Sequence, residues 1–153
     1  MFKKLKNVFA PTTAQDEPVA NLDGLQVAVA VLLSEIAKAD HDHADVETEE
    51  IRKQLSAHFS LSEIDAAELA ETARATAAES VSLHDFTKTL HERMSYKEKE
   101  AVVEMLWRIA LADLNLDKYE DYMIGKIAEL LYVYRTDVLR IKHGVSEDLR
   151  NSL

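Results

Sequence analysis

The sequence predicts an all-α fold, a compact bundle of about seven helices. Apolar residues recur at i, i+3, i+4 and i+7 along most of the 153-residue chain, which is the period of a helix with one buried face. No stretch alternates apolar and polar residues for long enough to indicate a strand. The chain contains three glycines and two prolines, so helices joined by few tight turns are expected.

The N-terminus differs from the rest of the chain. Residues 1–10 read MFKKLKNVFA, a basic amphipathic pattern that can rest on an anionic membrane surface. Its cations are Lys3, Lys4 and Lys6. The alternative is a frayed terminus or a short helix docked on the body. Both prolines lie in residues 11–18, which lack apolar periodicity and are typical of a tether. We therefore divide the chain into an N-terminal segment, 1–20, and a helical domain, 21–153.

Four helices are expected in the first half of the domain. The first carries a buried stripe of Val29, Leu32, Leu33, Ile36 and Ala37. The second is expected over 47–59. Ser60 has a glutamate three residues later, which is capping-box spacing and predicts a helix that ends near Ala78. Ser82 is expected to cap a short fourth helix.

Three more helices are expected in the second half. Ser95 has a glutamate three residues later, and so does Asp117, which predicts a capped helix after each. These two helices are expected over 96–112 and 118–132. Thr136 is expected to cap the last helix, with Gly144 as the residue that ends it. Aromatic residues and methionines at helical spacing are expected in the core. They are Met105, Trp107, Tyr119, Tyr122, Tyr132 and Tyr134.

An acidic helix–loop–helix unit occurs twice. Residues 29–51 read VAVLLSEIAKADHDHADVETEEI, and residues 102–124 read VVEMLWRIALADLNLDKYEDYMI. At one constant offset Asp40 aligns with Asp113, and Glu47 aligns with Glu120. Each copy has an apolar helix that ends in Ala-x-Ala-Asp, a short acidic loop, and a second helix that opens with a glutamate. The bundle is therefore expected to contain two pseudo-repeated units related by an approximate two-fold axis.

The two acidic loops are candidate sites for a divalent cation, with calcium, magnesium, manganese and zinc as the possibilities. Hard cations take oxygen ligands, which clustered carboxylates supply. Asp113, Asn115 and Asp117 match the first three ligand positions of an EF-hand loop. However, Lys118 and Ile124 stand where that loop requires glycine and a bidentate glutamate, so neither copy is an EF-hand. The candidate metal ligands are Asp40, Asp42, Asp45, Glu47, Asp113, Asp117 and Glu120.

The same carboxylates have explanations that need no metal. Asp117 and Glu120, three residues later, form a capping-box pattern. Asp45 and Glu47 place negative charge at a helix N-terminus, where the helix dipole favours it. Asp40 and Asp113 instead end apolar helices, where the dipole is unfavourable to an anion. Backbone N–H groups of the next helix, a basic side chain or a cation must therefore compensate. Local capping, metal binding and a salt bridge all remain open.

Composition narrows the classes of function. The net charge of −10 argues against a nucleic-acid partner. The absence of cysteine excludes disulfides, thiolate catalysis and cysteine-bound zinc, and it is typical of a reducing cytoplasm. We therefore expect a cytoplasmic protein, at most peripheral to a membrane. The sequence contains no nucleophile elbow, phosphate loop or H-E-x-x-H motif, so no enzymatic activity is expected. A metal-dependent phosphoester hydrolase is the remaining enzymatic alternative.

The motifs IAKADHDHADVETEEI and LWRIALADLNLDKYEDYMIGKIAELL resemble the tellurite-resistance protein B (TerB) family. This all-helical family is related to the N-terminal domain of DjlA-type co-chaperones. The resemblance covers about residues 25–143. It implies a bacterial, stress-associated, non-enzymatic protein whose paired acidic loops carry candidate metal ligands. By motif position these ligands are Asp40, Glu47, Asp113, Asp117 and Glu120. The family's loop glycine is replaced by His41 in one copy and Leu114 in the other, which removes the residue best suited to a positive φ.

Two functions therefore remain in view. The leading hypothesis is a helical stress-response protein whose acidic loops bind a divalent cation. The alternative is a metal-free protein–protein interaction module, possible at the membrane surface through the basic N-terminus. A protein partner is expected, but the sequence does not identify it, and the oligomeric state stays open.

Overall fold

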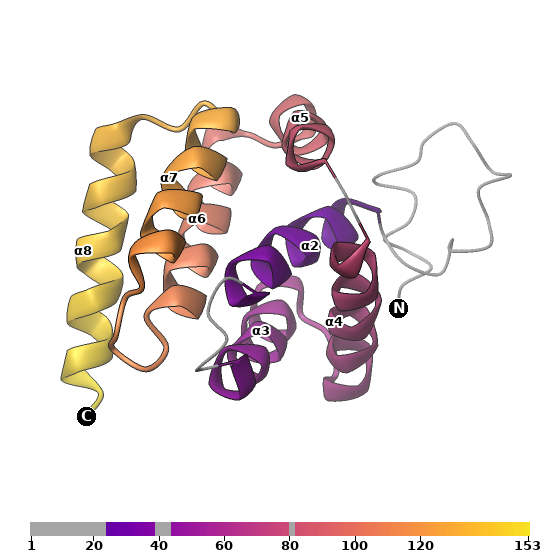
Figure 1. The fold of residues 1–153 in the computed structure, drawn as a ribbon, viewed down its shortest axis with the longest axis horizontal. Helices are drawn as coiled ribbons and strands as arrows, with labels where there is room; N and C mark the ends of the chain where they lie inside the picture. Colours follow the sequence, from indigo (N-terminus) through magenta and orange to yellow (C-terminus); the bar gives the residue numbers. More distant parts are fainter. Residues whose placement is uncertain (1–23, 39–43, 80–81) are drawn as a thin grey trace, which may run out of the picture.

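The computed structural model describes residues 24–38, 44–79 and 82–153, and within these ranges it contains seven α-helices and no strand (Figure 1). The helices are α2 (Gly24–Lys38), α3 (Ala44–Phe59), α4 (Glu63–Ala78), α5 (Leu83–Arg93), α6 (Tyr96–Ala110), α7 (Lys118–Leu130) and α8 (Arg135–Asn151). The predicted all-α class is therefore confirmed. The N-terminal cations Lys3, Lys4 and Lys6 lie outside the described residues. None of the described helices is both long and apolar enough to cross a membrane.

The helices form two groups that meet along α2 and α6. Helices α2, α3 and α4 pack together, and α6, α7 and α8 lie side by side (Figure 1). Helix α2 also contacts α6, so the first helix of each acidic unit forms the contact between the groups. Helix α5 lies at one end of the molecule, where it contacts α2 and α7.

The core lies around α2 and α6 because these helices are covered on several sides. The predicted stripe of α2 is buried, and so are Ala30 and Val31, which a helix with a single buried face would expose. In α6 the side chains of Leu106, Trp107 and Ile109 are at most 1% exposed. Each large aliphatic side chain removed from water in this way stabilises the fold by about 1.5–3 kcal/mol.

Several predicted helix starts are confirmed. Ser95 and Glu98 form a reciprocal capping box on α6, in which Glu98 N–H donates to Ser95 Oγ (3.2 Å) and Ser95 N–H donates to Glu98 Oε1 (2.8 Å). The hydroxyl of Ser82 accepts from the N–H of Asp85 and caps α5. These caps satisfy N–H groups that have no partner inside the helix.

The start of α4 was predicted wrongly. Ser62, not Ser60, caps this helix, and its Oγ accepts from Asp65 N–H at 3.1 Å. Ser60 instead follows the end of α3 with φ 55°, and the next residue, Leu61, donates its N–H to Ser56 O at 3.0 Å. This is the Schellman motif, in which a helix ends with one residue in the left-handed region. Ser60 therefore belongs to the end of α3. Helix α4 begins two residues later than the capping-box spacing at Ser60 predicts.

The end of the last helix was also predicted wrongly. Helix α8 begins after Tyr134, not at a Thr136 cap, and it continues through Gly144 to Asn151. Gly144 lacks the positive φ that a terminating glycine adopts. Val145, directly after it, is 2% exposed. Burial of this side chain against the core favours continuing the helix over ending it.

Candidate functional site

The second acidic loop joins α6 to α7, and two of its carboxylates are used within the loop. Asn115 N–H donates to Asp113 Oδ1 at 3.0 Å, a side-chain turn that closes the bend. Tyr119 N–H donates to Asp117 Oδ2 at 3.2 Å, so Asp117 caps α7 as predicted. Both interactions are local. Asp117 caps the next helix, as predicted, whereas Asp113 accepts from an N–H group of the loop itself and not from the next helix.

Leu114 adopts the backbone conformation that favours glycine. Its φ is 66°, and its N–H donates to Leu111 O at 2.8 Å. This is the position at which the resemblance places a loop glycine. The bend therefore forms without glycine, with a leucine that is 41% exposed held in the left-handed region.

Glu120 is the most buried carboxylate of the loop region. The residue is 0% exposed and lies in the first turn of α7. The Oδ2 atom of Asp113 is buried as well. Neither side chain is without a partner in the structure. Burial of two carboxylates at one end of α7 requires compensation by donors or by positive charge.

The first acidic loop is only partly described. Asp40 and Asp42 lie outside the described residues. Asp45 and Glu47 fall in the first turn of α3, and their side chains are likewise not described. The predicted equivalence of Asp40 and Asp113 therefore stays a prediction. Within the described residues, no three His, Asp or Glu side chains gather closely enough to hold a metal ion.

Four tyrosines lie on the surface, which corrects the prediction that they are core residues. Tyr119, Tyr122, Tyr132 and Tyr134 are 55%, 61%, 69% and 71% exposed. Met105 and Trp107 are buried as predicted. Among the described residues, six of the eight exposed large apolar side chains lie within 114–139. The sequence contained a usable signal, because Tyr119 and Tyr122 share a helical face with Lys126 and Glu129.

The exposed face of α7 that carries Tyr119 and Tyr122 is called the tyrosine-bearing face. It borders a groove between α7 and α8 with a volume of about 580 Å³. Tyr122, Gly125, Val133 and Val138 line it together with charged side chains. The Arg135 side chain lies close to α7 at Gly125, because a Cβ at this position would lie 3.2 Å from Nη1 of Arg135. The α7–α8 hairpin thus offers both exposed aromatic rings and a concave surface beside them.

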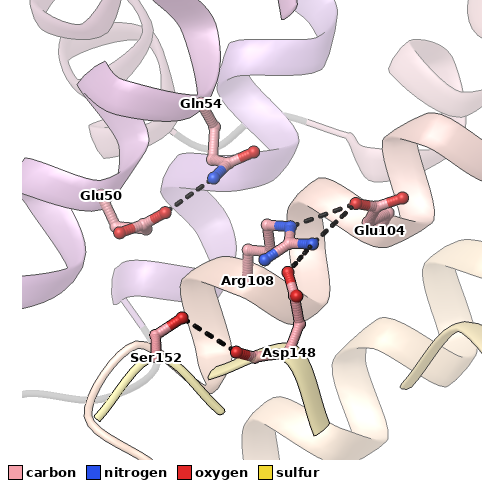
Figure 2. Close-up of polar contacts among 6 residues, drawn as sticks. All are labelled: Glu50, Gln54, Glu104, Arg108, Asp148 and Ser152. Atoms are coloured by element: carbon pink, nitrogen blue, oxygen red, sulfur yellow. Dashed lines mark hydrogen bonds and ion pairs between the residues drawn. The ribbon is translucent and has the colours of Figure 1, made fainter. Parts of the chain in front are cut away.

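The polar contacts on the neighbouring side of α6 are structural. Arg108 of α6 donates to Asp148 of α8 (2.9 Å) and to Glu104 (3.1 Å) (Figure 2). Burial lowers the pKa of Arg108, but its hydrogen bonds to Asp148 and Glu104 outweigh this effect and leave the pKa raised. On α3, Gln54 donates to Glu50 at 2.6 Å (Figure 2). The ion pair between Arg108 and Asp148 holds α8 against α6, and the Gln54 amide supplies a donor for Glu50.

Comparison with known proteins gives one match. The family described as "Tellurite resistance protein TerB" matches residues 26–143, which is most of the chain. No curated protein and no solved structure matches the chain. The matched range contains both acidic units, the tyrosine-bearing face of α7 and the first turns of α8.

Proposed function

The chain belongs to the tellurite resistance protein TerB family, and from this premise we propose that it is a non-enzymatic, tellurite-resistance-like helical protein that acts by protein association. The contact surface is the outer face of α7. The observation that carries the proposal is the exposure of two tyrosines on this face, Tyr119 (55%) and Tyr122 (61%). Tyrosine is enriched in protein interfaces because its ring buries a large apolar area while its hydroxyl finds a partner.

A second copy of this chain fits the surface. Tyr119, Tyr122, Lys126 and Glu129 form one exposed stripe along the length of α7. Two such stripes in antiparallel contact, with the two-fold axis at position 124, place Tyr122 against Lys126 and Tyr119 against Glu129. Both pairs are symmetric about this position. The first pair supplies a cation–π contact and the second a hydroxyl–carboxylate hydrogen bond. Such an interface is self-complementary, as a two-fold symmetric dimer requires.

The charged members of the stripe are available for this contact. Within the described part of the chain, neither Lys126 nor Glu129 forms an ion pair with another residue of its own molecule. The acidic loop before α7 then has a supporting role. Asp113 and Asp117 fix the loop and start the helix, so they orient the stripe.

Sedimentation velocity of the full chain over a concentration series tests this function. Wild type should shift from monomer to dimer as concentration rises, at about micromolar levels, because the surface is small for a protein interface. Tyr122→Ser should remain monomeric. Ile64→Ser is the matched control, because Ile64 is 80% exposed on α4 and lies away from α7. A wild type that stays monomeric, or an equal effect of both variants, would contradict the proposal.

A divalent cation at the acidic loops is a second candidate function. It is favoured by the burial of Glu120 and of Asp113 Oδ2 beside the loop. A cation held jointly with the first acidic loop would add positive charge to the interactions that these buried carboxylates already form. A thermal-shift scan against calcium, magnesium, manganese and zinc tests it. A melting temperature that rises with one ion supports the site, and no response to any ion removes it.

A further inference from the structure

Helices α2, α3 and α4 pack together in the other half of the molecule (Figure 1). A separate cavity lies between them. Its volume is about 310 Å³, at the small end of the range for ligand pockets. Its walls are largely aliphatic and include Ala37 of α2, Ile51 of α3, and Ala70 and Ala77 of α4. The alanines of α4 leave this space because their side chains are too short to fill the gap to the neighbouring helices.

The rim of the cavity is basic, although the chain as a whole carries a net charge of −10. Three cations, Lys38, Arg52 and Arg74, line it beside a single carboxylate, Glu71. Each helix of the cavity thus contributes one cation. Each cation is paired with a carboxylate of its own helix, Glu35, Glu49 or Glu71. Three cationic donors from three helices beside an apolar wall are nevertheless the chemistry expected for an anionic head group attached to an apolar chain.

These cations are held by contacts that are easily exchanged. Arg74 contacts Glu71 one turn earlier on the same helix, at 2.6 and 3.1 Å, and Arg52 pairs with Glu49 in the same way. Both ion pairs are exposed, and exposed ion pairs contribute little to stability, so a carboxylate bound by the two guanidinium groups can replace Glu49 and Glu71. Lys38 is fixed more firmly, because it also donates to Ala77 O at 3.0 Å across the cavity.

Ser34 of α2 adds a hydroxyl group to the wall of the cavity. The residue is 7% exposed and lines the cavity. A polar group of a ligand can form a hydrogen bond with this hydroxyl, which both donates and accepts.

We propose that the cavity between α2, α3 and α4 binds a small amphiphilic carboxylate. Its apolar chain lies along Ile51, Ala70 and Ala77, and its carboxylate accepts hydrogen bonds from the cations at the rim. The site shares no residue with the tyrosine-bearing face of α7, so the two proposals stand or fall separately.

Isothermal titration calorimetry of the full chain with sodium octanoate tests the proposal, with octanol as the uncharged analogue. Octanoate should bind and octanol should bind about tenfold more weakly or worse, because it lacks the charge-assisted contacts. Arg74→Gln should weaken octanoate binding by a similar factor. Arg140→Gln is the matched control, since it removes the same charge from α8 and should leave binding unchanged.

A cavity-filling variant separates binding from folding. Ala70→Leu extends a half-buried side chain into the cavity and should abolish octanoate binding while the melting temperature is kept or raised. Absence of octanoate binding to wild type would overturn the proposal. So would equal binding of octanol, equal weakening by Arg74→Gln and Arg140→Gln, or a stably folded Ala70→Leu variant that binds octanoate like wild type.

Discussion

The hydroxyl of Tyr96, in the first turn of α6, donates a hydrogen bond to Asp137 Oδ2, in the first turn of α8, across 2.6 Å. The hydroxyl oxygen of Tyr96 also accepts a hydrogen bond from the backbone N–H of Tyr134, at 3.0 Å. Two segments about 40 residues apart in sequence are thus joined at one atom. This contact fixes the start of α8, which has no side-chain cap of its own.

Removing this hydroxyl should loosen α8. Tyr96→Phe is expected to lower the melting temperature by about 2–4 °C, because a hydrogen bond to a charged acceptor is lost while the ring remains. Tyr134→Phe is the control, since the Tyr134 side chain is 71% exposed and forms no hydrogen bond through its hydroxyl in the described structure. Thermal unfolding by circular dichroism measures both. Equal melting temperatures for all three proteins would contradict the assigned role.

The effect of Tyr96→Phe should depend on pH. The Tyr96 hydrogen bond, and then Arg140, lower the pKa of Asp137 below its ordinary value of 3.8. A carboxyl with a lowered folded-state pKa contributes stability above its ordinary pKa and loses it as pH falls through the folded value. The advantage of wild type over Tyr96→Phe should therefore be constant near neutral pH and shrink below pH 3.8. An advantage that persists at lower pH would exclude Asp137 as its source.

Gly144→Ala should stabilise the protein by about 1 kcal/mol, because glycine inside a helix is unfavourable relative to alanine. Nothing lies within 4 Å of a Cβ at this position. At Gly125 the added Cβ would meet Arg135 at 3.2 Å, so Gly125→Ala should gain less. Urea unfolding compares the two variants. Destabilisation by Gly144→Ala would indicate that Gly144 ends the helix after all.

Leu114→Gly should also stabilise the protein, by about 1 kcal/mol, because φ 66° is strained for leucine and not for glycine. Leu114→Ala is the matched control, since it removes the side chain but keeps the Cβ that causes the strain. It should bring no such gain. If both variants shifted the unfolding midpoint equally, the effect would come from the side chain and not from the backbone.

The carboxylates of the second loop should differ in their roles. Asp117→Ala is expected to cost about 1 kcal/mol through loss of the α7 cap. Asp113→Asn should cost little, because asparagine can accept the same N–H of Asn115. If capping is the whole role of the loop, neither change depends on divalent ions. A cation that stabilises wild type but not Asp113→Asn would instead assign a metal ligand, and thermal unfolding with and without each ion distinguishes the cases.

Much of the fold could be predicted from local sequence. The capping box at Ser95 and the cap at Asp117 are short-range patterns, and both are confirmed. The prediction failed at Gly144, where a local stop signal competes with burial of the next side chain, Val145. It failed at Ser60 because the end of one helix and the start of the next compete for the same residues. Tertiary packing decided the case at Gly144, and the local hydrogen bonding at the end of α3 decided the case at Ser60.

Less of the candidate site could be predicted. The resemblance marks position 114 as a loop glycine, but leucine itself gives no sign of the positive φ that Leu114 adopts. The exposure of Tyr119 and Tyr122 was not predicted, because aromatic residues at helical spacing are usually core residues. The polar residues Lys126 and Glu129 on the same helical face indicate exposure instead. The cavity beside Ala70 depends on how three helices meet, so no local pattern predicts it.

Cysteine cross-linking tests the association through α7 most directly, and the chain has no cysteine of its own to interfere. Antiparallel stripes bring position 122 of one copy opposite position 126 of the other, within the span of about 4.4–6.8 Å between Cα atoms that a disulfide allows. Tyr122→Cys and Lys126→Cys proteins, mixed and oxidised, should therefore form a heterodimeric disulfide quickly. Each variant oxidised alone should cross-link slowly, because identical positions lie farther apart across the two-fold axis. Cross-linking that is no faster in the mixture than in either variant alone would contradict the account.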